Sequence, residues 1–177
     1  PVHWMTLEET AWIARVFVGL GVHRVRLTGG EPLLRARFGD LVQMLGKIDG
    51  LNDLSLSTNG TQLARYAGTL KASGVNRLNV SLDTLSRTRF VELAKRDALP
   101  DVLAGLEAAK REGFELIKIN MVWIPEINGN DLEPIVEYCR SQGFVLRLIE
   151  NMPMGDAARR LGSTSLQPVI DDLRQQH

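Results

Sequence analysis

The chain has 177 residues, of which 44% are hydrophobic and 24% charged, the balance of an ordinary globular domain. Lysine and arginine number 21, as do aspartate and glutamate, and this zero net charge argues against a nucleic-acid-binding domain or a polybasic membrane anchor. No apolar run approaches the ~18 residues that span a bilayer, and a single cysteine, Cys139, excludes an internal disulfide and suits a reducing cytoplasm.

Helices and strands are predicted to alternate along the chain. Thr6 and Glu9 have the spacing of a capping box and predict the start of a helix, which Gly19 and Gly21 end. Its apolar residues at helical spacing are Ile13, Ala14, Phe17 and Leu20. Further helices are expected at residues 38–48, 62–72, 88–95, 102–112, 132–142 and 166–175. Short apolar strands are expected at residues 24–28, 54–57, 77–81, 116–123 and 145–149.

This alternation predicts an α/β fold with a parallel sheet, closed as a barrel or open, whose strands follow one another in chain order. We assign residues 1–155 to that unit and residues 156–177 to the start of a following region. The chain begins with Pro1 rather than Met, so we expect a segment to be missing upstream.

Polar residues follow the predicted strands at their carboxyl ends, where parallel α/β folds carry their ligand sites. The segments are Thr28-Gly29-Gly30-Glu31-Pro32, Ser57-Thr58-Asn59-Gly60, Ser81-Leu82-Asp83, and Glu150 to Gly155. Their convergence predicts a ligand site at this rim. Each motif alone is weaker, because Gly29-Gly30 and Thr58-Asn59-Gly60 also fit simple turns.

Two cations lie on strands that helices should cover. Arg26 and Lys118 therefore need either a partner or a ligand, and both would suit a polyphosphate. The alternative is an internal salt bridge from these cations to Glu31 or Glu150.

Other residue types point to no site. The three histidines, His3, His23 and His177, are scattered and suggest no metal centre. Cys139 lies in a predicted helix, remote from the strand ends, and is interpreted as a packing residue.

The run from Arg24 to Arg35, centred on Gly29-Gly30-Glu31-Pro32, resembles the Gly-Gly-Glu-Pro segment of radical-SAM enzymes. Its Arg-x-Thr pattern and four later segments are similar to those of the GTP 3',8-cyclases of molybdenum-cofactor biosynthesis. These segments are Ser57 to Gly60, Asn79 to Asp83, Ile117 to Asn120 and Arg147 to Met152. The resemblance covers Thr6 to Gly155 and implies a partial (β/α)6 barrel of the radical-SAM type, whose first strand is missing from this chain.

The resemblance also implies which residues contact ligands. For S-adenosylmethionine these are Gly30, Glu31, Ser81 and Met152, with Glu31 near the amino group and Met152 beside the adenine. For GTP they are Arg26, Ser57 and Lys118. Ser57 stands where the family usually has threonine, so its hydroxyl is retained, and no catalytic residue is assigned.

The activity implied is conversion of GTP to (8S)-3',8-cyclo-7,8-dihydroguanosine 5'-triphosphate, the first step of molybdenum cofactor biosynthesis, by a cytoplasmic lyase. The family uses two 4Fe–4S clusters, whose cysteines are expected outside this chain, so the chain alone is expected to be inactive. We expect no nucleic-acid or membrane partner, leave the electron donor unnamed and allow for a homodimer. A peptide-modifying radical-SAM enzyme and a degenerate, non-catalytic nucleotide-binding barrel remain open as alternatives.

Overall fold

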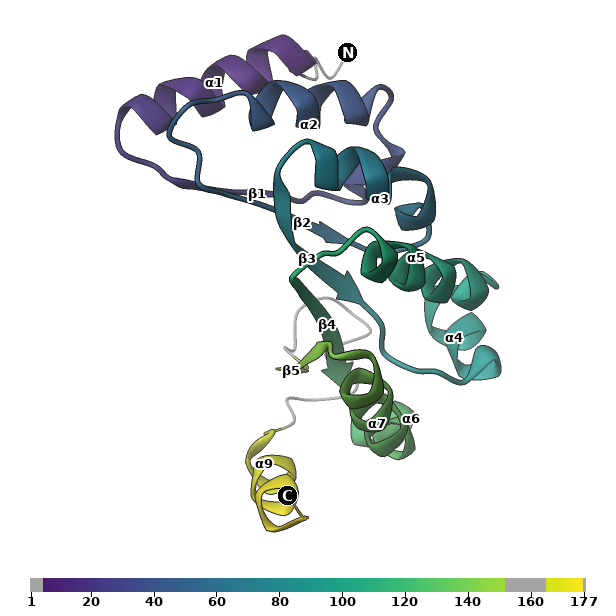
Figure 1. Cartoon of the computed structure of the whole chain (residues 1–177). Coiled ribbons are helices and arrows are strands. Elements are labelled where there is room, and N and C mark those ends of the chain that lie inside the picture. Colours follow the sequence, from purple (N-terminus) through teal and green to yellow (C-terminus); the bar gives the residue numbers. More distant parts are fainter. Residues whose placement is uncertain (1–4, 152–164, 177) are drawn as a thin grey trace. The chain divides into compact units, whose positions relative to one another are not determined.

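The computed structural model describes residues 5–151 and 165–176 (Figure 1). Within these residues five parallel strands form one sheet in the order β1-β2-β3-β4-β5. They are β1 (Arg24–Leu27), β2 (Asp53–Thr58), β3 (Val75–Ser81), β4 (Leu116–Trp123) and β5 (Val145–Glu150). The α/β class and the consecutive strand order predicted from the sequence are confirmed.

Helices connect the strands. They are α1 (Leu7–Gly19), α2 (Phe38–Gly46), α3 (Leu63–Ala72), α4 (Arg87–Ala94), α5 (Leu99–Arg111), α6 (Pro125–Asn128), α7 (Leu132–Gln142) and α9 (Gln167–Gln176), with 3-10 turns η1 (Pro32–Leu34) and η2 (Gly129–Asp131). The sequence did not predict η1, α6 or η2, because three or four residues are too few to show a hydrophobic period. Helix α5 begins three residues before the prediction, since proline is tolerated in a first turn.

The start of α1 is the capping box predicted from the sequence. The Glu9 amide donates to Thr6 Oγ1 at 3.0 Å, and the Thr6 amide donates to the Glu9 carboxylate at 2.7 Å. The helix ends at Gly19, and Gly21 then takes a positive φ of 94°, which favours glycine. Two orphan amides are satisfied at one end and a left-handed turn closes the other.

The chain divides into two compact units. The first comprises Pro1–Val80 with Ala98–Ile117, and the second comprises Ser81–Asp97 with Lys118–His177. In the first unit α1, α2, α3 and α5 pack in succession against one face of β1 to β3 (Figure 1). Its fully buried side chains include Phe38, Leu45, Leu56, Leu63, Leu70, Leu78 and Leu106.

Helix α1 is apolar on two sides. Leu7, Ala11 and Val18 are buried, whereas Trp12, Phe17 and Leu20 are 64%, 52% and 77% exposed. The predicted helix is therefore correct, but Phe17 and Leu20, two of the apolar residues that predicted it, do not face the core. When both sides are apolar, the period predicts the helix and not the side that packs.

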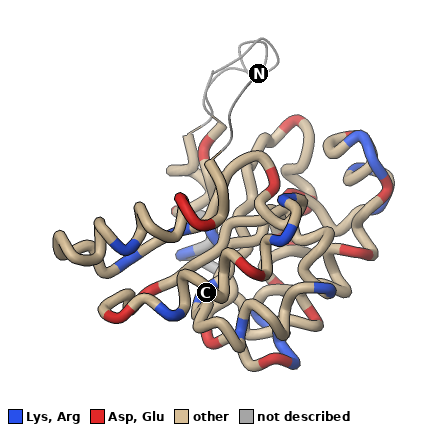
Figure 2. The backbone as a smooth tube through the Cα atoms, turned by 90° about the horizontal axis from the view of Figure 1, so that it is seen from above, with Lys and Arg blue, Asp and Glu red and all other residues tan. Residues whose placement is uncertain are grey.

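In the second unit α7 packs against β5, and the buried residues include Ile135 and Cys139 of α7 and Ile119 and Met121 of β4. An ion pair of 2.5 Å joins Arg89 of α4 to the largely buried Asp131. Lys and Arg are interspersed with Asp and Glu along the backbone of the chain (Figure 2). Across residues 5–151 and 165–176, no helix has the length and apolar character needed to cross a membrane.

Candidate functional site

The strands of the first unit have one apolar and one polar face. The parallel register aligns Leu27 with Leu56 and Leu56 with Leu78, which places these apolar residues toward the helices. Because side chains alternate along a strand, the opposite face carries the intervening polar residues. These are Arg24 and Arg26 on β1, Asp53, Ser55 and Ser57 on β2, and Arg77 and Asn79 on β3. The predicted GTP contacts Arg26 and Ser57 thus share one polar strand face.

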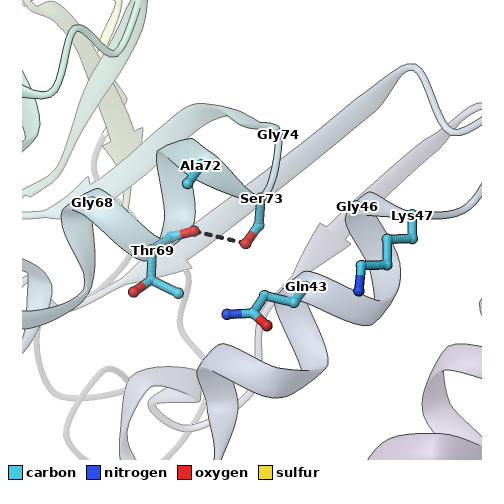
Figure 3. A pocket seen from close by; sticks show the side chains of 8 residues that line it. All are labelled: Gln43, Gly46, Lys47, Gly68, Thr69, Ala72, Ser73 and Gly74. Carbon is cyan, nitrogen blue, oxygen red and sulfur yellow. Dashed lines mark hydrogen bonds between the residues drawn. The ribbon is translucent and has the colours of Figure 1, made fainter.

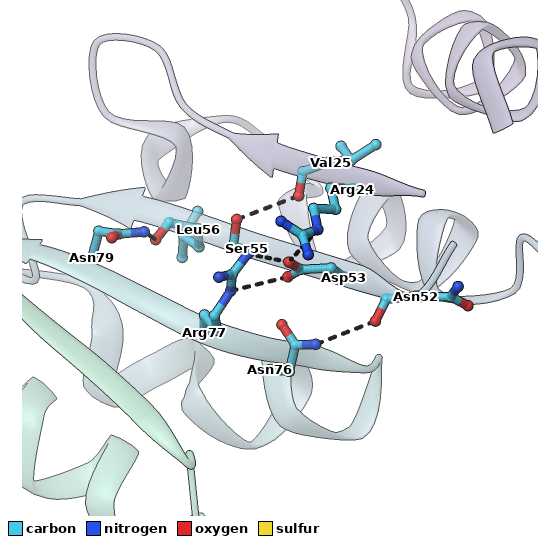
Figure 4. Close-up of polar contacts among 9 residues, drawn as sticks. All are labelled: Arg24, Val25, Asn52, Asp53, Ser55, Leu56, Asn76, Arg77 and Asn79. Atoms are coloured by element: carbon cyan, nitrogen blue, oxygen red, sulfur yellow. Dashed lines mark hydrogen bonds and ion pairs between the residues drawn. The ribbon is translucent and has the colours of Figure 1, made fainter. Parts of the chain in front are cut away.

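At the amino ends of these strands, Asp53 neutralises two cations (Figure 4). Arg77 Nε donates to Asp53 Oδ1 at 3.1 Å, with a second contact from its terminal nitrogen to Oδ2. Arg24 approaches the same carboxylate at 3.7 Å from a largely exposed position, where an ion pair contributes little. A groove of about 520 Å³ lies beside this network, and its two arginines are already paired with Asp53.

Arg26 differs from these two arginines. Its side chain is exposed and makes no ion pair or hydrogen bond within residues 5–151 and 165–176. Lys118 on β4 of the second unit is half-buried and likewise has no partner in the described part of the chain. Internal salt bridges, the alternative raised by the sequence, are absent from these residues. Each cation is available to an anionic ligand.

Glu31 is engaged by its own unit rather than by a cation. Its Oε1 accepts hydrogen bonds from the Leu33 amide at 3.1 Å and from the Thr58 hydroxyl at 2.7 Å. Its Oε2 accepts one from the Asn59 amide at 2.6 Å. The carboxylate therefore ties the turn after β1 to the turn after β2.

The backbone before Glu31 is open. A Cβ built on Gly29 or on Gly30 would meet no atom within 4 Å, and both residues are exposed. Gly30 also lacks a positive φ, so neither packing nor backbone conformation explains a glycine there. The open space and the half-exposed carboxylate leave room for an extended ligand that carries an ammonium group.

The Thr58-Asn59-Gly60 segment is a tight turn, as the simpler interpretation proposed. Asn59 Oδ1 accepts from the Thr61 amide at 3.0 Å, and Gly60 has a positive φ of 80°. A Cβ on Gly60 would lie 2.9 Å from Val80 Cγ1, so the turn packs tightly against β3. This geometry fixes where β2 ends and therefore where Ser57 lies.

In the second unit Ser81 is exposed at the end of β3, close to a network that joins β3 to β4. Asp83 accepts a hydrogen bond from the Val122 amide at 2.8 Å. Burial raises the pKa of Asp83, and that hydrogen bond partly offsets the rise. Asn128 donates to the carbonyls of Asp83 and Val122 at 3.0 and 2.9 Å. Sequence reasoning missed Asn128, because α6 was too short to predict.

The polar face of β4 and β5 carries two residues beside Lys118. Asn120 lies two residues further along β4 and pairs in register with Arg147 of β5, which is exposed. The Asn120 Oδ1 atom is buried without a hydrogen-bond partner in the described residues, which is costly unless a ligand or water supplies a donor. Arg147 was not singled out from the sequence, and the strand register is the signal that identifies it.

Met152, the remaining predicted contact, and the boundary at residue 155 lie outside the described residues. A groove of about 650 Å³ between α2 and α3 has Lys47 as its one charged lining residue (Figure 3). A Cβ on Gly46 would lie 2.1 Å from the Ser73 carbonyl oxygen, so the two helices meet closely at this groove. We assign it to helix packing rather than to ligand binding.

An iron–sulfur cluster does not fit the residues present. The chain has one cysteine, Cys139, which is 3% exposed in α7. Burial raises the pKa of its thiol to about 11, and clusters are held by thiolates. Among the described residues, no group of three or more histidine, cysteine, aspartate or glutamate side chains lies together.

A parallel sheet with helical connections and a polar strand face defines an α/β protein of the barrel-related type. Escherichia coli coproporphyrinogen III oxidase (HemN), a radical SAM enzyme, shares this fold with a TM-score of 0.59 at 18% identity, covering 94% of this chain and 43% of that one. The anSMEcpe structure with bound AdoMet and Kp18Cys peptide gives 0.66 at 20% identity, covering 84% and 43%. The chain belongs to the radical SAM superfamily, whose family model matches residues 1–139.

Relatives of higher sequence identity carry a more specific name than that of the superfamily. Over 176 residues the chain is 43% identical to the GTP 3',8-cyclase of Ectopseudomonas mendocina, a match that covers 98% of this chain and 53% of the relative. It is 46% identical over 154 residues to the GTP 3',8-cyclase of Erythrobacter litoralis, covering 86% and 46%. The chain thus spans about half the length of the curated relatives it matches.

Proposed function

We propose that this chain supplies ligand-binding strands of a GTP 3',8-cyclase, a radical-SAM lyase that acts in molybdenum cofactor biosynthesis. The proposal is carried by two cations on polar strand faces, Arg26 and Lys118, that have no side-chain partner among residues 5–151 and 165–176. A GTP triphosphate is a multiply charged anion that such groups would bind through charge-assisted hydrogen bonds. We choose GTP among nucleotides because the similar proteins are named GTP 3',8-cyclases.

On the substrate side, Arg26 and Lys118 bind phosphate oxygens and Ser57 contributes its hydroxyl from β2. Asp53 pairs with the neighbouring Arg24 and Arg77 and not with Arg26, which favours an anion position at Arg26 on that strand face. Binding by fixed strand residues also orients the nucleotide, which is how positioning lowers a reaction barrier.

On the cofactor side, Gly30 leaves room for S-adenosylmethionine to lie along the backbone, and Glu31 accepts from its ammonium group. Ser81 and Met152 complete the proposed set. When bound with a reducing iron–sulfur cluster, S-adenosylmethionine supplies the radical chemistry of the superfamily.

The cluster itself needs ligands from outside this sequence. Since Cys139 is a buried thiol, we propose that the chain alone forms no product and that the two 4Fe–4S clusters of the enzyme are held by other residues. The protein is proposed to act in the cytoplasm, with the homodimer kept as a hypothesis for sedimentation analysis.

The test is anaerobic turnover by the natural polypeptide that carries this chain, after iron and sulfide reconstitution. With GTP and S-adenosylmethionine, we expect 5'-deoxyadenosine and a cyclised nucleotide with the mass of GTP. Turnover with a peptide and not with GTP would instead support the peptide-modifying alternative. Binding of GTP without any 5'-deoxyadenosine would support the non-catalytic barrel.

A further inference from the structure

Thr58 makes two hydrogen bonds that fix the direction of its hydroxyl proton. Its side chain lies at the end of β2 and the residue is 5% exposed. The Gly60 amide, which can only donate, donates to Thr58 Oγ1 at 3.0 Å. The hydroxyl proton is therefore free to point at Glu31 Oε1, which lies 2.7 Å away.

Glu31 in turn has nearly all of its acceptor capacity occupied. A carboxylate offers about four lone-pair sites, and three are filled by Leu33, Thr58 and Asn59. Two of these hydrogen bonds go to Oε1, so the one acceptor site that is still unfilled belongs to Oε2. The carboxylate thus keeps one acceptor position in a fixed direction, on the residue that directly follows the open backbone of Gly29 and Gly30.

We propose that Thr58 is a positioning residue for cofactor binding, acting through Glu31. The inference rests on the proposed function, in which Glu31 receives the ammonium group of S-adenosylmethionine. The Thr58 hydroxyl holds Oε1, so that Oε2 keeps the orientation which the ammonium needs. A held carboxylate loses less rotational freedom on binding than a free one, and this preorganisation raises affinity.

A purely structural role for Thr58 predicts something different. In that case the hydroxyl would only satisfy the Gly60 amide and stabilise the turn. Its loss would then lower the unfolding midpoint and weaken both ligands together, because Ser57 of the same strand end is on the GTP side. Positioning predicts that cofactor affinity falls while GTP affinity holds.

The test compares Thr58→Val, which keeps the shape and removes the hydroxyl, with Thr58→Ser, which keeps the hydroxyl. Isothermal titration with S-adenosylmethionine and separately with GTP is run on the cluster-loaded natural protein. We expect Thr58→Val to weaken cofactor binding about tenfold, as for a lost hydrogen bond to a charged group. We expect Thr58→Ser to restore it to within about threefold and GTP binding to stay unchanged in both.

Ser55→Ala is the matched control. Ser55 lies on the same strand, is 3% exposed and donates to the Val25 carbonyl rather than to Glu31, so cofactor binding should not change. If Thr58→Val does not fold, Thr58→Ala takes its place. Unchanged cofactor affinity in the hydroxyl-free variant, or equal loss of both ligands, overturns the inference alone. A wild-type protein that binds no S-adenosylmethionine overturns the proposed function and the inference with it.

Discussion

Replacing Gly105 of α5 by alanine should destabilise the protein, although helix propensity alone predicts that it would be stabilised. A Cβ at this position would lie 2.7 Å from the Gly60 carbonyl oxygen and 2.9 Å from Leu63 Cβ. The first of these atoms is backbone and the second is the root of a side chain that is fully buried. Neither can rotate away, so Gly105→Ala must separate α5 from the turn after β2.

Two effects of known size compete in this variant. Alanine in place of glycine favours a helix interior by about 1 kcal/mol. Overpacking a tight core costs about 1–3 kcal/mol, and contacts this short belong at the upper end of that range. We therefore expect Gly105→Ala to lower the free energy of unfolding by about 1–2 kcal/mol. In a chain of this size the melting temperature would fall by roughly 2–8 °C.

The control is Gly68→Ala in α3, where the nearest atoms are the Glu112 carboxylate oxygens at 3.6 Å or more. That distance is an ordinary contact, so helix propensity should win and stability should rise by up to about 1 kcal/mol. Urea denaturation of both variants, with unchanged m values, measures whether each substitution lowers or raises the free energy of unfolding. A Gly105→Ala variant as stable as the wild type would refute the close approach of α5 to the turn.

Three further outcomes are expected. Lys118→Ala should weaken GTP binding about 10- to 100-fold in isothermal titration and leave cofactor binding unchanged, since it removes one charge-assisted contact; equal loss of both would indicate unfolding. Leu70→Ala, at a fully buried position, should cost about 2–5 kcal/mol in urea denaturation, against less than about 0.5 kcal/mol for Leu34→Ala at a position 65% exposed. The Cys139 thiol, whose pKa burial raises to about 11, should react slowly with a thiol reagent near pH 8 and rapidly once unfolded. Because the unfolded thiol ionises first, stability should also fall as pH rises from about 9 toward 11, and fast native reaction would show Cys139 to be accessible.

The strands and long helices could be predicted because their signals are local. The capping box at Thr6 and Glu9 and the alternating apolar residues of β4 each specify structure within a few residues. The order of the strands followed from short helical connections, which keep neighbours in chain order adjacent in the sheet.

Contacts between residues far apart in the sequence could not be predicted from local patterns. The sequence offered Glu31 as a ligand group, with a salt bridge to Arg26 as the alternative, and it did not reveal the hydrogen bonds of this carboxylate to Thr58 and Asn59. Likewise, Arg147 gained significance only from its register with Asn120. Such pairings depend on how distant segments meet, which no local pattern contains.

The outer side of α1 shows a third kind of limit. Its apolar spacing correctly predicted a helix, but Leu20 is 77% exposed and the buried side is that of Ala11 and Val18. A helix that is apolar on two sides has two candidate packing faces, and only tertiary structure chooses between them.

The central claim is that Arg26 and Lys118, on the polar strand faces, bind the triphosphate of GTP. It is tested most directly by comparing the dissociation constants of GTP and guanosine for the wild-type protein and for an Arg26→Ala, Lys118→Ala double variant. We predict that the wild type binds GTP about 100-fold or more tightly than guanosine, and that the difference falls to about tenfold or less in the variant. Equal affinity of the wild type for GTP and guanosine, or a difference that the double variant leaves intact, would contradict the claim.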